Sequence, residues 1–425
     1  MSQSIDTLQV DWNGRLVGYL DQMSGREMSF RYADDYLASP TPRPISQSLP
    51  LQAEAFDPPV TRAWFTNLLP EGEIRGHVAR RLGISERNDF ALLKAIGGDC
   101  AGALRLLPVS SSGVDAGELI PLPWDELEAR IAATPRPSLL ALILQDGELR
   151  LSLAGAQDKL PVHCRDGRLS LPTGDAASTH LLKISSGGFP DLVQNELFCL
   201  TLARAIGLDV PHTELAPTAT PILLIERYDR RVDDDASVHR LHQEDFCQAL
   251  GVPPETKYEN EGGPTLAQMF EVLAHGSQSP LPDKKSLLTW VLFNVLIGNA
   301  DAHAKNVSLL YGQSDAPARR RLAPFYDLVC TAVYDQLSTR LAQKIGGEYR
   351  VEHVASRHWD RLAESIGVKS GYLRSLGLEI CDRVAAAAPA IATEIGEAHS
   401  AQATLERIAR VIERRVSRVR GALDR

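Results

Sequence analysis

The first part of the chain alternates between short apolar strands and amphipathic helices. Apolar and polar residues alternate over 8–12, Asn13-Gly14 is a strong hairpin turn, and a second apolar run returns over 16–20, so we predict a β-hairpin. Three helices and one further strand are expected after it, over 62–69, 72–82, 89–96 and 103–107. The small and polar residues 109–117 are the best candidate linker, which makes 1–110 a small mixed α/β domain.

The rest of the chain changes from a strand-rich to a helical pattern. We predict a helix over 123–132, strands over 149–153, 160–163 and 179–184, a helix over 194–206 and a buried strand over 221–228. This order resembles the nucleotide-binding lobe of a kinase, so 111–240 is the candidate nucleotide-binding lobe. Beyond residue 243 nearly every strong segment is helical, over 266–274, 284–297, 352–366, 369–388 and 403–419. We expect an α+β protein with a protein-kinase-like fold, in which 241–425 forms an all-helical C-terminal lobe.

The clearest chemical signal is the stretch 287–311, where an apolar run ends abruptly in a polar loop. The loop holds Asp301, His303 and Asn306, and a short apolar strand follows it. The D-x-x-x-x-N spacing of Asp301 and Asn306 is that of kinase catalytic loops, in which the Asp accepts the substrate's hydroxyl proton and the Asn holds a metal ion. Asp327, after an apolar-aromatic segment, lies where a second metal-binding carboxylate is needed. A satisfied network of buried hydrogen bonds is the alternative.

Three motifs upstream are ambiguous when each is taken alone. The segment SLAGAQDK at 152–159 has small residues that let backbone N–H groups approach phosphate oxygens, but by itself an ordinary turn explains it better. Lys183 lies in an apolar strand and suits phosphate binding with Glu196 as its acidic partner; a solvent-facing lysine on an edge strand is the alternative. The residues ERY at 226–228 follow an apolar strand, at the position where the hinge of a kinase contacts adenine. A charged strand end is the alternative.

Composition limits the partners and the compartment. The net charge of −9 argues against a chain whose whole surface binds nucleic acid, although it suits a basic protein partner. The six cysteines form no metal-binding pattern, so we expect reduced core thiols. No apolar run is long enough to cross a bilayer and the N-terminus lacks a signal sequence, so we expect a soluble cytoplasmic protein without membrane contact. The arginines of the last helix favour a solvated face, and 242–245 favours an acidic helix N-terminus over a metal site.

Taken together, the motifs resemble one known family over nearly the whole chain. The segments occur in the family's order: SLAGAQDKLPV, THLLKIS, NELFCLTLARAIGL, IERYDR, RLHQEDFCQALG, KYENEGGP, NVLIGNADAHAKN, LAPFYDLV and KIGGEY. WFTNLLPEGEIR and GGDCAGAL also resemble the family's N-terminal domain. The chain is therefore similar to the HipA family of serine/threonine-protein kinase toxins, which belong to toxin–antitoxin systems.

The resemblance implies an enzyme that uses ATP and Mg²⁺, with a HipA-like N-terminal subdomain over 1–110. It implies that Asp301 is the catalytic base and that Asn306 and Asp327 hold Mg²⁺. It implies nucleotide contacts from Ala154, Gly155, Ala156, Gln157, Asp158, Lys159, Lys183, Glu226, Arg227, Tyr228, His303, Asn306, Tyr326 and Asp327. Ser152 matches the family's autophosphorylation serine, where a phosphate would add about two negative charges and so could eject the phosphate loop and silence the enzyme.

The resemblance also implies a substrate and partners. Family toxins phosphorylate aminoacyl-tRNA synthetases, notably the glutamyl enzyme, and a HipB-like helix-turn-helix antitoxin neutralises them and binds operator DNA. Asp158 stands where other members often carry Glu, and its shorter side chain reaches less far. Two alternatives remain open: a kinase for a small molecule or lipid, and a catalytically silent corepressor that tethers an antitoxin to DNA.

Overall fold

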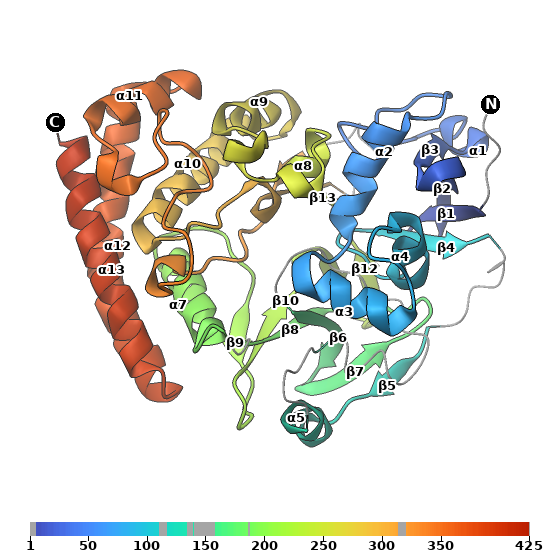
Figure 1. Ribbon diagram of the computed structural model, residues 1–425, viewed down its shortest axis with the longest axis horizontal. Helices are drawn as coiled ribbons and strands as arrows, with labels where there is room; N and C mark the ends of the chain where they lie inside the picture. Colours follow the sequence, from blue (N-terminus) through green and yellow to red (C-terminus); the bar gives the residue numbers. More distant parts are fainter. Residues whose placement is uncertain are drawn as a thin grey trace. The chain divides into compact units, whose positions relative to one another are not determined.

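The protein is seen here in a computed structural model, which describes residues 6–109, 117–133, 139, 158–185, 188–312 and 320–424 (Figure 1). The chain forms two compact units. Unit 1 comprises Met1–Ser186, Ala216–Glu255 and Leu310–Arg319, and unit 2 comprises Gly187–Leu215, Thr256–Leu309 and Arg320–Arg425. Each unit therefore takes segments that are far apart in the sequence. The division into domains 1–110, 111–240 and 241–425 stays a prediction.

Unit 1 opens with a four-stranded antiparallel sheet. Its strands are β1 (Asp6–Trp12), β2 (Arg15–Gln22), β3 (Met28–Tyr32) and β4 (Leu104–Pro108), in the order β3-β2-β1-β4. Asn13 and Gly14 both have positive φ, 53° and 82°, as a tight hairpin turn requires, so the predicted hairpin is confirmed. The strand expected over 103–107 is confirmed as β4.

Four helices pack in the same part of unit 1. They are α1 (Asp34–Leu37), α2 (Pro58–Phe65), α3 (Gly72–Leu82) and α4 (Asp89–Ile96). The last two have the predicted bounds. Helix α2 begins earlier than expected because Pro58, which needs no N–H partner, occupies its first turn. Trp64 and Phe65 of α2 are fully buried in the core beneath the sheet.

A second antiparallel sheet carries the predicted nucleotide-binding strands. Unit 1 contributes β5 (Leu119–Pro121), β7 (Arg168–Pro172), β6 (Lys159–Arg165), β8 (His180–Ile184) and β10 (Ile222–Glu226), which are neighbours in that order. Helix α5 (Trp124–Ala132) packs its buried Leu127 into the core of this sheet. The strand expected over 149–153 lies outside the described residues. Unit 1 also contains β11 (Arg230–Val232), β12 (Val238–Arg240), β13 (Gln243–Asp245) and α8 (Phe246–Ala249).

Unit 2 is mainly helical, but the expectation that 241–425 is all-helical was wrong, because three short strands lie in that range. Its helices are α7 (Leu192–Ala205), α9 (Leu266–Gly276), α10 (Pro280–Ile297), α11 (Ser356–Ser365), α12 (Ser370–Ala398) and α13 (Gln402–Leu423). Short strands β9 (Thr213–Leu215) and β15 (Arg320–Leu322) also occur, and β14 (Ser308–Tyr311) begins in unit 2. Every residue of α10 from Leu287 to Ile297 is buried, so this helix is the core of the unit.

Two expectations about the C-terminal helices were wrong. Helix α12 does not end at residue 388 but continues through Pro389, because the buried residues Ala392 and Ile395 extend its packed face. Arg415 does not belong to a solvated face: it is buried and donates to the carbonyl of Val295 at 3.0 Å. Among the described helices, none combines the length and apolar composition needed to cross a membrane. All six cysteines are free thiols, as predicted.

Candidate active site

The catalytic-loop candidate begins where α10 ends, at a position that only glycine fits well. Gly298 has a φ of 75°, in the left-handed region that commonly closes a helix. A Cβ atom there would lie 2.9 Å from the Cβ of Ala332. The chain therefore turns sharply out of the buried helix, and the polar residues that follow are delivered to one place. The helix, polar loop and strand predicted over 287–311 are confirmed as α10, the loop and β14.

Asn299, which the sequence analysis did not single out as a functional residue, organises the loop. Its side chain is buried; Oδ1 accepts the backbone N–H of Asp301 at 3.0 Å. Its Nδ2 donates to Oδ1 of Asn294 at 2.8 Å and to the backbone carbonyl of Asp327 at 3.4 Å. One amide group thus holds the backbones of both predicted carboxylate residues. A short amide side chain directly after the helix-ending glycine was the available signal, because such residues bond nearby backbone.

Asp301 and Asn306 close the loop on itself. Nδ2 of Asn306 donates to the backbone carbonyl of Asp301 at 2.8 Å, and the Asn306 N–H donates to the carbonyl of His303 at 3.0 Å. The Asp301 side chain is 52% exposed, while that of His303 is buried. The Asp301 carboxylate is therefore accessible on a loop whose backbone is fixed, which is the arrangement a general base requires.

Tyr326 and Asp327 are held next to this loop. The Tyr326 hydroxyl donates to the carbonyl of Lys305 at 2.8 Å and lies 2.6 Å from Oγ of Ser308. Asp327 has a φ of 52°, a conformation that is uncommon outside glycine and tends to occur at functional sites. Unit 2 therefore brings together Asp301, His303, Asn306, Tyr326 and Asp327 as neighbours of one buried loop.

The donor atoms of this loop fit Mg²⁺. Asp327 supplies a carboxylate and Asn306 an amide oxygen, and both are hard oxygen ligands of the type that Mg²⁺ takes alongside water and phosphate. Nδ2 of Asn306 donates to the carbonyl of Asp301, which fixes the orientation of the amide. Oδ1 of Asn306 is therefore the atom that would bind the ion. The described residues contain no cluster of three or more His, Cys, Asp or Glu able to hold a metal by themselves.

The other predicted nucleotide residues belong to unit 1. Lys183 lies on β8, an inner strand between β6 and β10, and it is only 2% exposed, which excludes a solvent-facing lysine on an edge strand. Lys159 on β6 is directly paired with Lys183 in the register. The Asp158 carboxylate accepts the backbone N–H of Leu139. Ser152, Ala154, Gly155, Ala156 and Gln157 lie outside the described residues.

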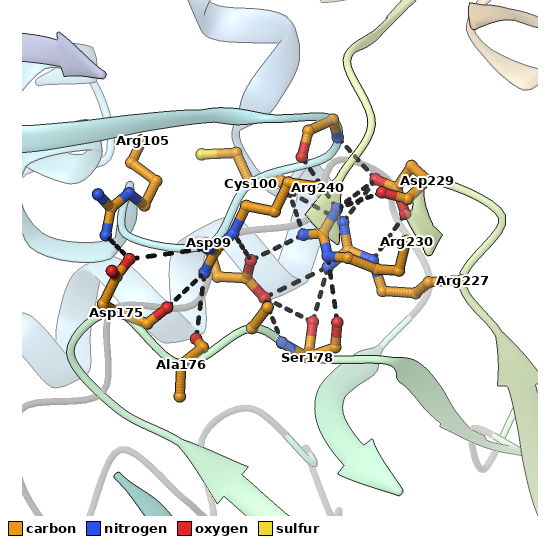
Figure 2. A network of polar contacts seen from close by, with 12 residues as sticks. Asp99, Cys100, Arg105, Asp175, Ala176, Ser178, Arg227, Asp229, Arg230 and Arg240 are labelled. Atoms are coloured by element: carbon orange, nitrogen blue, oxygen red, sulfur yellow. Dashed lines mark hydrogen bonds and ion pairs between the residues drawn. The ribbon is translucent and has the colours of Figure 1, made fainter. Parts of the chain in front are cut away.

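The predicted hinge residues differ strongly in their surroundings. Glu226 is exposed at the end of β10, and the Tyr228 hydroxyl donates to the side-chain oxygen of Gln243. Arg227 is buried, and its guanidinium donates to both carboxylate oxygens of Asp229, to Oγ of Ser178 and to the carbonyl of Cys100 (Figure 2). Only the backbone of Arg227 is therefore available to a nucleotide.

Arg227 belongs to a buried ion network that joins the hinge segment to the loop after α4. Asp99 in that loop accepts from Arg230 at 2.7 Å and from Arg240 at 3.2 Å, and Arg227 lies 3.4 Å away (Figure 2). Burial by itself would raise the pKa of Asp99, but the attraction of the three guanidinium groups and the hydrogen bond from Ser178 outweigh it and lower the pKa. The network gives rigid support to the segment 226–228, the predicted hinge.

The segment 242–245 is not a metal site. Glu244, on β13, accepts from the hydroxyls of Ser46 and Tyr311 at 2.5 Å each. Asp245 caps α8 by accepting the N–H of Gln248 at 2.8 Å. The expected acidic helix start is thus confirmed for Asp245, whereas Glu244 serves a separate buried hydrogen-bond cluster.

Comparison with known proteins places this chain among the serine/threonine kinases. The protein "Putative kinase Y4mE" of Sinorhizobium fredii is 41% identical over 421 residues, which are 98% of this chain and 99% of that protein. The "Serine/threonine-protein kinase toxin HipA" of Shewanella oneidensis is 29% identical over 89% of this chain and 87% of that protein. This chain is accordingly a kinase.

The particular family follows from the domain matches. Residues 8–107 match the HipA N-terminal domain and residues 151–391 match the HipA-like C-terminal domain, so the chain belongs to the HipA family. The solved complex of Shewanella oneidensis HipA with HipB and operator DNA contains a chain of the same fold, with a TM-score of 0.84 and 27% identity over 98% of each chain. The α+β kinase-like fold expected from the sequence is confirmed.

Proposed function

We propose that this protein is a toxin kinase that transfers the γ-phosphoryl group of ATP to a serine of an aminoacyl-tRNA synthetase, most readily the glutamyl enzyme, and thereby stops translation. The observation that carries the proposal is the fixed loop of unit 2, in which one buried amide, Asn299, bonds the backbones of both Asp301 and Asp327. Kinase catalysis consists mainly of positioning and electrostatic stabilisation, and both depend on such rigidity.

In this proposal each residue has a definite task. Asp301 accepts the proton of the acceptor hydroxyl and orients its oxygen toward the γ-phosphorus. Asn306 and Asp327 hold Mg²⁺, which when bound neutralises charge on the phosphate oxygens. Lys183 binds the phosphates, while His303 and Tyr326 contact the nucleotide.

The adenine and the phosphate tail are assigned to unit 1. Glu226, Arg227 and Tyr228 contact adenine, with Arg227 contributing its backbone because its side chain is engaged with Asp229. The segment 154–159 forms the phosphate loop. Ser152 accepts a phosphoryl group in cis, and the added negative charge switches the enzyme off.

The partners follow from the relatives. Because the Shewanella oneidensis structure is a complex of HipA, HipB and operator DNA, we propose that a HipB-like helix-turn-helix antitoxin binds this kinase and carries it to DNA. The acidic net charge of −9 agrees with DNA contact mainly through the partner rather than through this chain as a whole.

The test is phosphoryl transfer from labelled ATP to purified synthetases, compared between wild type, Asp301→Asn and a matched control. Asp301→Asn should lower kcat by about 10²- to 10⁴-fold while ATP still binds, because a general base is lost. Asp382→Asn, which removes an exposed carboxylate paired with Arg420, should leave kcat unchanged. Unimpaired transfer by Asp301→Asn would refute the assigned base.

The same assay decides between the alternatives for the substrate. Label on a lipid or metabolite, with none on protein, would overturn the protein-kinase proposal for this chain. Phosphate on the purified wild-type chain that disappears in Ser152→Ala, measured by mass spectrometry, would support transfer in cis. If expression of wild type arrests growth and expression of Asp301→Asn does not, the toxin activity depends on the kinase activity.

A further inference from the structure

One described side chain donates a hydrogen bond directly to the predicted catalytic base. The hydroxyl of Tyr258 donates to Oδ1 of Asp301, and its ring lies edge-on to the ring of His303, with centroids 5.0 Å apart and an interplanar angle of 84°. Tyr258 belongs to the motif KYENEGGP, which lies outside the predicted catalytic loop in sequence. The inference drawn from this contact rests on the proposed function of Asp301.

The contacts of the Asp301 carboxylate are concentrated on one oxygen. Oδ1 accepts from Tyr258, and Nε2 of His303 lies 3.6 Å from the same atom. Both of these contacts fall on Oδ1 and neither is made to Oδ2. The two neighbours therefore fix the rotation of the carboxylate, and Oδ2 is the oxygen left for an acceptor hydroxyl.

Tyr258 is itself held in place rather than hanging from a loose loop. Its carbonyl accepts the N–H of Gly263 at 2.9 Å, and a Cβ at Gly263 would lie only 2.7 Å from that oxygen, so the turn requires glycine. The next residue, Glu259, accepts the N–H of Lys344 through Oε2 at 2.6 Å. The N–H of Glu259 also donates to the carbonyl of Ala342 at 3.4 Å. The segment is thus fastened at two points beside Tyr258.

We infer that Tyr258 is a positioning residue for phosphoryl transfer, which acts by holding Oδ1 of Asp301 so that Oδ2 faces the acceptor hydroxyl. A hydrogen bond to an ionised carboxylate is stronger and more directional than one between neutral groups. Without it the carboxylate rotates among rotamers, and only a fraction of the bound complexes have a base in line with the hydroxyl. Such a loss lowers kcat and leaves nucleotide binding unchanged, because removal of the hydroxyl alone keeps the ring beside His303.

Tyr258→Phe tests this directly, since it deletes one hydroxyl and keeps the ring beside His303. We expect kcat to fall by about ten- to hundredfold, the range for losing a hydrogen bond to a charged group, while the Kd for ATP is unchanged. The melting temperature should stay within about 2 °C of wild type. Tyr372→Phe, which deletes a hydroxyl from a 45% exposed tyrosine on α12, is the matched control and should behave as wild type.

A double variant separates positioning from a general structural effect. In the Asp301→Asn background, Tyr258→Phe should cause little further loss, because the group that it positions is already gone. An equal loss in both backgrounds, or an unchanged kcat in Tyr258→Phe, would overturn the inference. A rise in kcat would also overturn it, and would mean that Tyr258 competes with the acceptor for Asp301. If wild type transfers no phosphate, the proposed function fails together with this inference. If wild type is active and Tyr258→Phe has the same kcat, only the inference fails.

Discussion

Nδ2 of Asn299 lies 3.4 Å from the backbone carbonyl oxygen of Asp327, so the end of one helix supports a residue that comes much later in the chain. Oδ1 of the same amide accepts the N–H of Asp301. The relative position of the two carboxylate residues thus depends on a buried side chain that belongs to neither motif. This dependence makes Asn299 a sharper test of the site than either carboxylate, because its amide has no charge and no catalytic chemistry.

We therefore predict that Asn299→Ala lowers kcat strongly while Asn67→Ala does not. Both changes remove a buried asparagine amide that bonds backbone carbonyls, in Asn67 those of Ala63 and Val252, and both should cost about 1–3 kcal/mol of stability. Only Asn299 supports the predicted catalytic loop. Urea denaturation and steady-state kinetics measured on both variants give the comparison, and equal kinase activity of the two at matched stability would contradict it.

Breaking the ion network at Asp99 should be costly. Asp99→Asn leaves three buried guanidinium groups without their shared carboxylate, so we expect a loss of about 3–5 kcal/mol at pH 7. Because the pKa of Asp99 is lowered on folding, its stabilisation is complete above the unfolded value of about 4 and is lost as the pH falls below it. The stability difference between wild type and variant should thus be constant from pH 5 to 8 and shrink in acid. Asp234→Asn, at an exposed carboxylate, serves as the control.

His242 predicts a second pH dependence in a different window. Its ring is buried between Trp12 and Tyr311, and burial lowers its pKa to about 4, although the hydrogen bond to the Ile45 carbonyl opposes this. The unfolded chain takes up this proton near pH 6.5 and the folded chain only near pH 4, so stability falls as the pH drops between these values, by roughly 3 kcal/mol in total. His242→Phe should lack this slope in denaturation curves. A slope identical to wild type would contradict the assignment.

Lys183 predicts a defect in nucleotide binding. Lys183→Met keeps the length of the side chain and removes its charge from β8. We expect the Kd for ATP to rise by about ten- to hundredfold, because a charged contact with the phosphates is lost. Calorimetric titration with ATP measures this. Lys285→Met, at an exposed lysine on α10, should bind ATP as wild type does, and an unchanged Kd for Lys183→Met would remove this residue from the nucleotide site.

Local patterns predicted most elements of the fold because the physical forces involved are local. The Asn13-Gly14 hairpin follows from backbone conformations that these two residues tolerate, and the bounds of α3 and α4 follow from helical periodicity and their flanking residues. The expected end of α12 at residue 388 was wrong, because the missing N–H of Pro389 costs less than the buried packing beyond it contributes.

The sequence by itself determined the kind of protein this is: the ordered motifs indicated the HipA family, and the spacing of Asp301 and Asn306 indicated a kinase loop. Only the tertiary structure decided that Arg227 is buried in an ion network with Asp99, that Asn299 supports two carboxylate residues and that Tyr258 donates to Asp301. The physical reason is that spacing along a chain constrains residues within one helix, strand or turn. Contacts between segments far apart in sequence depend on how the packed core directs each side chain.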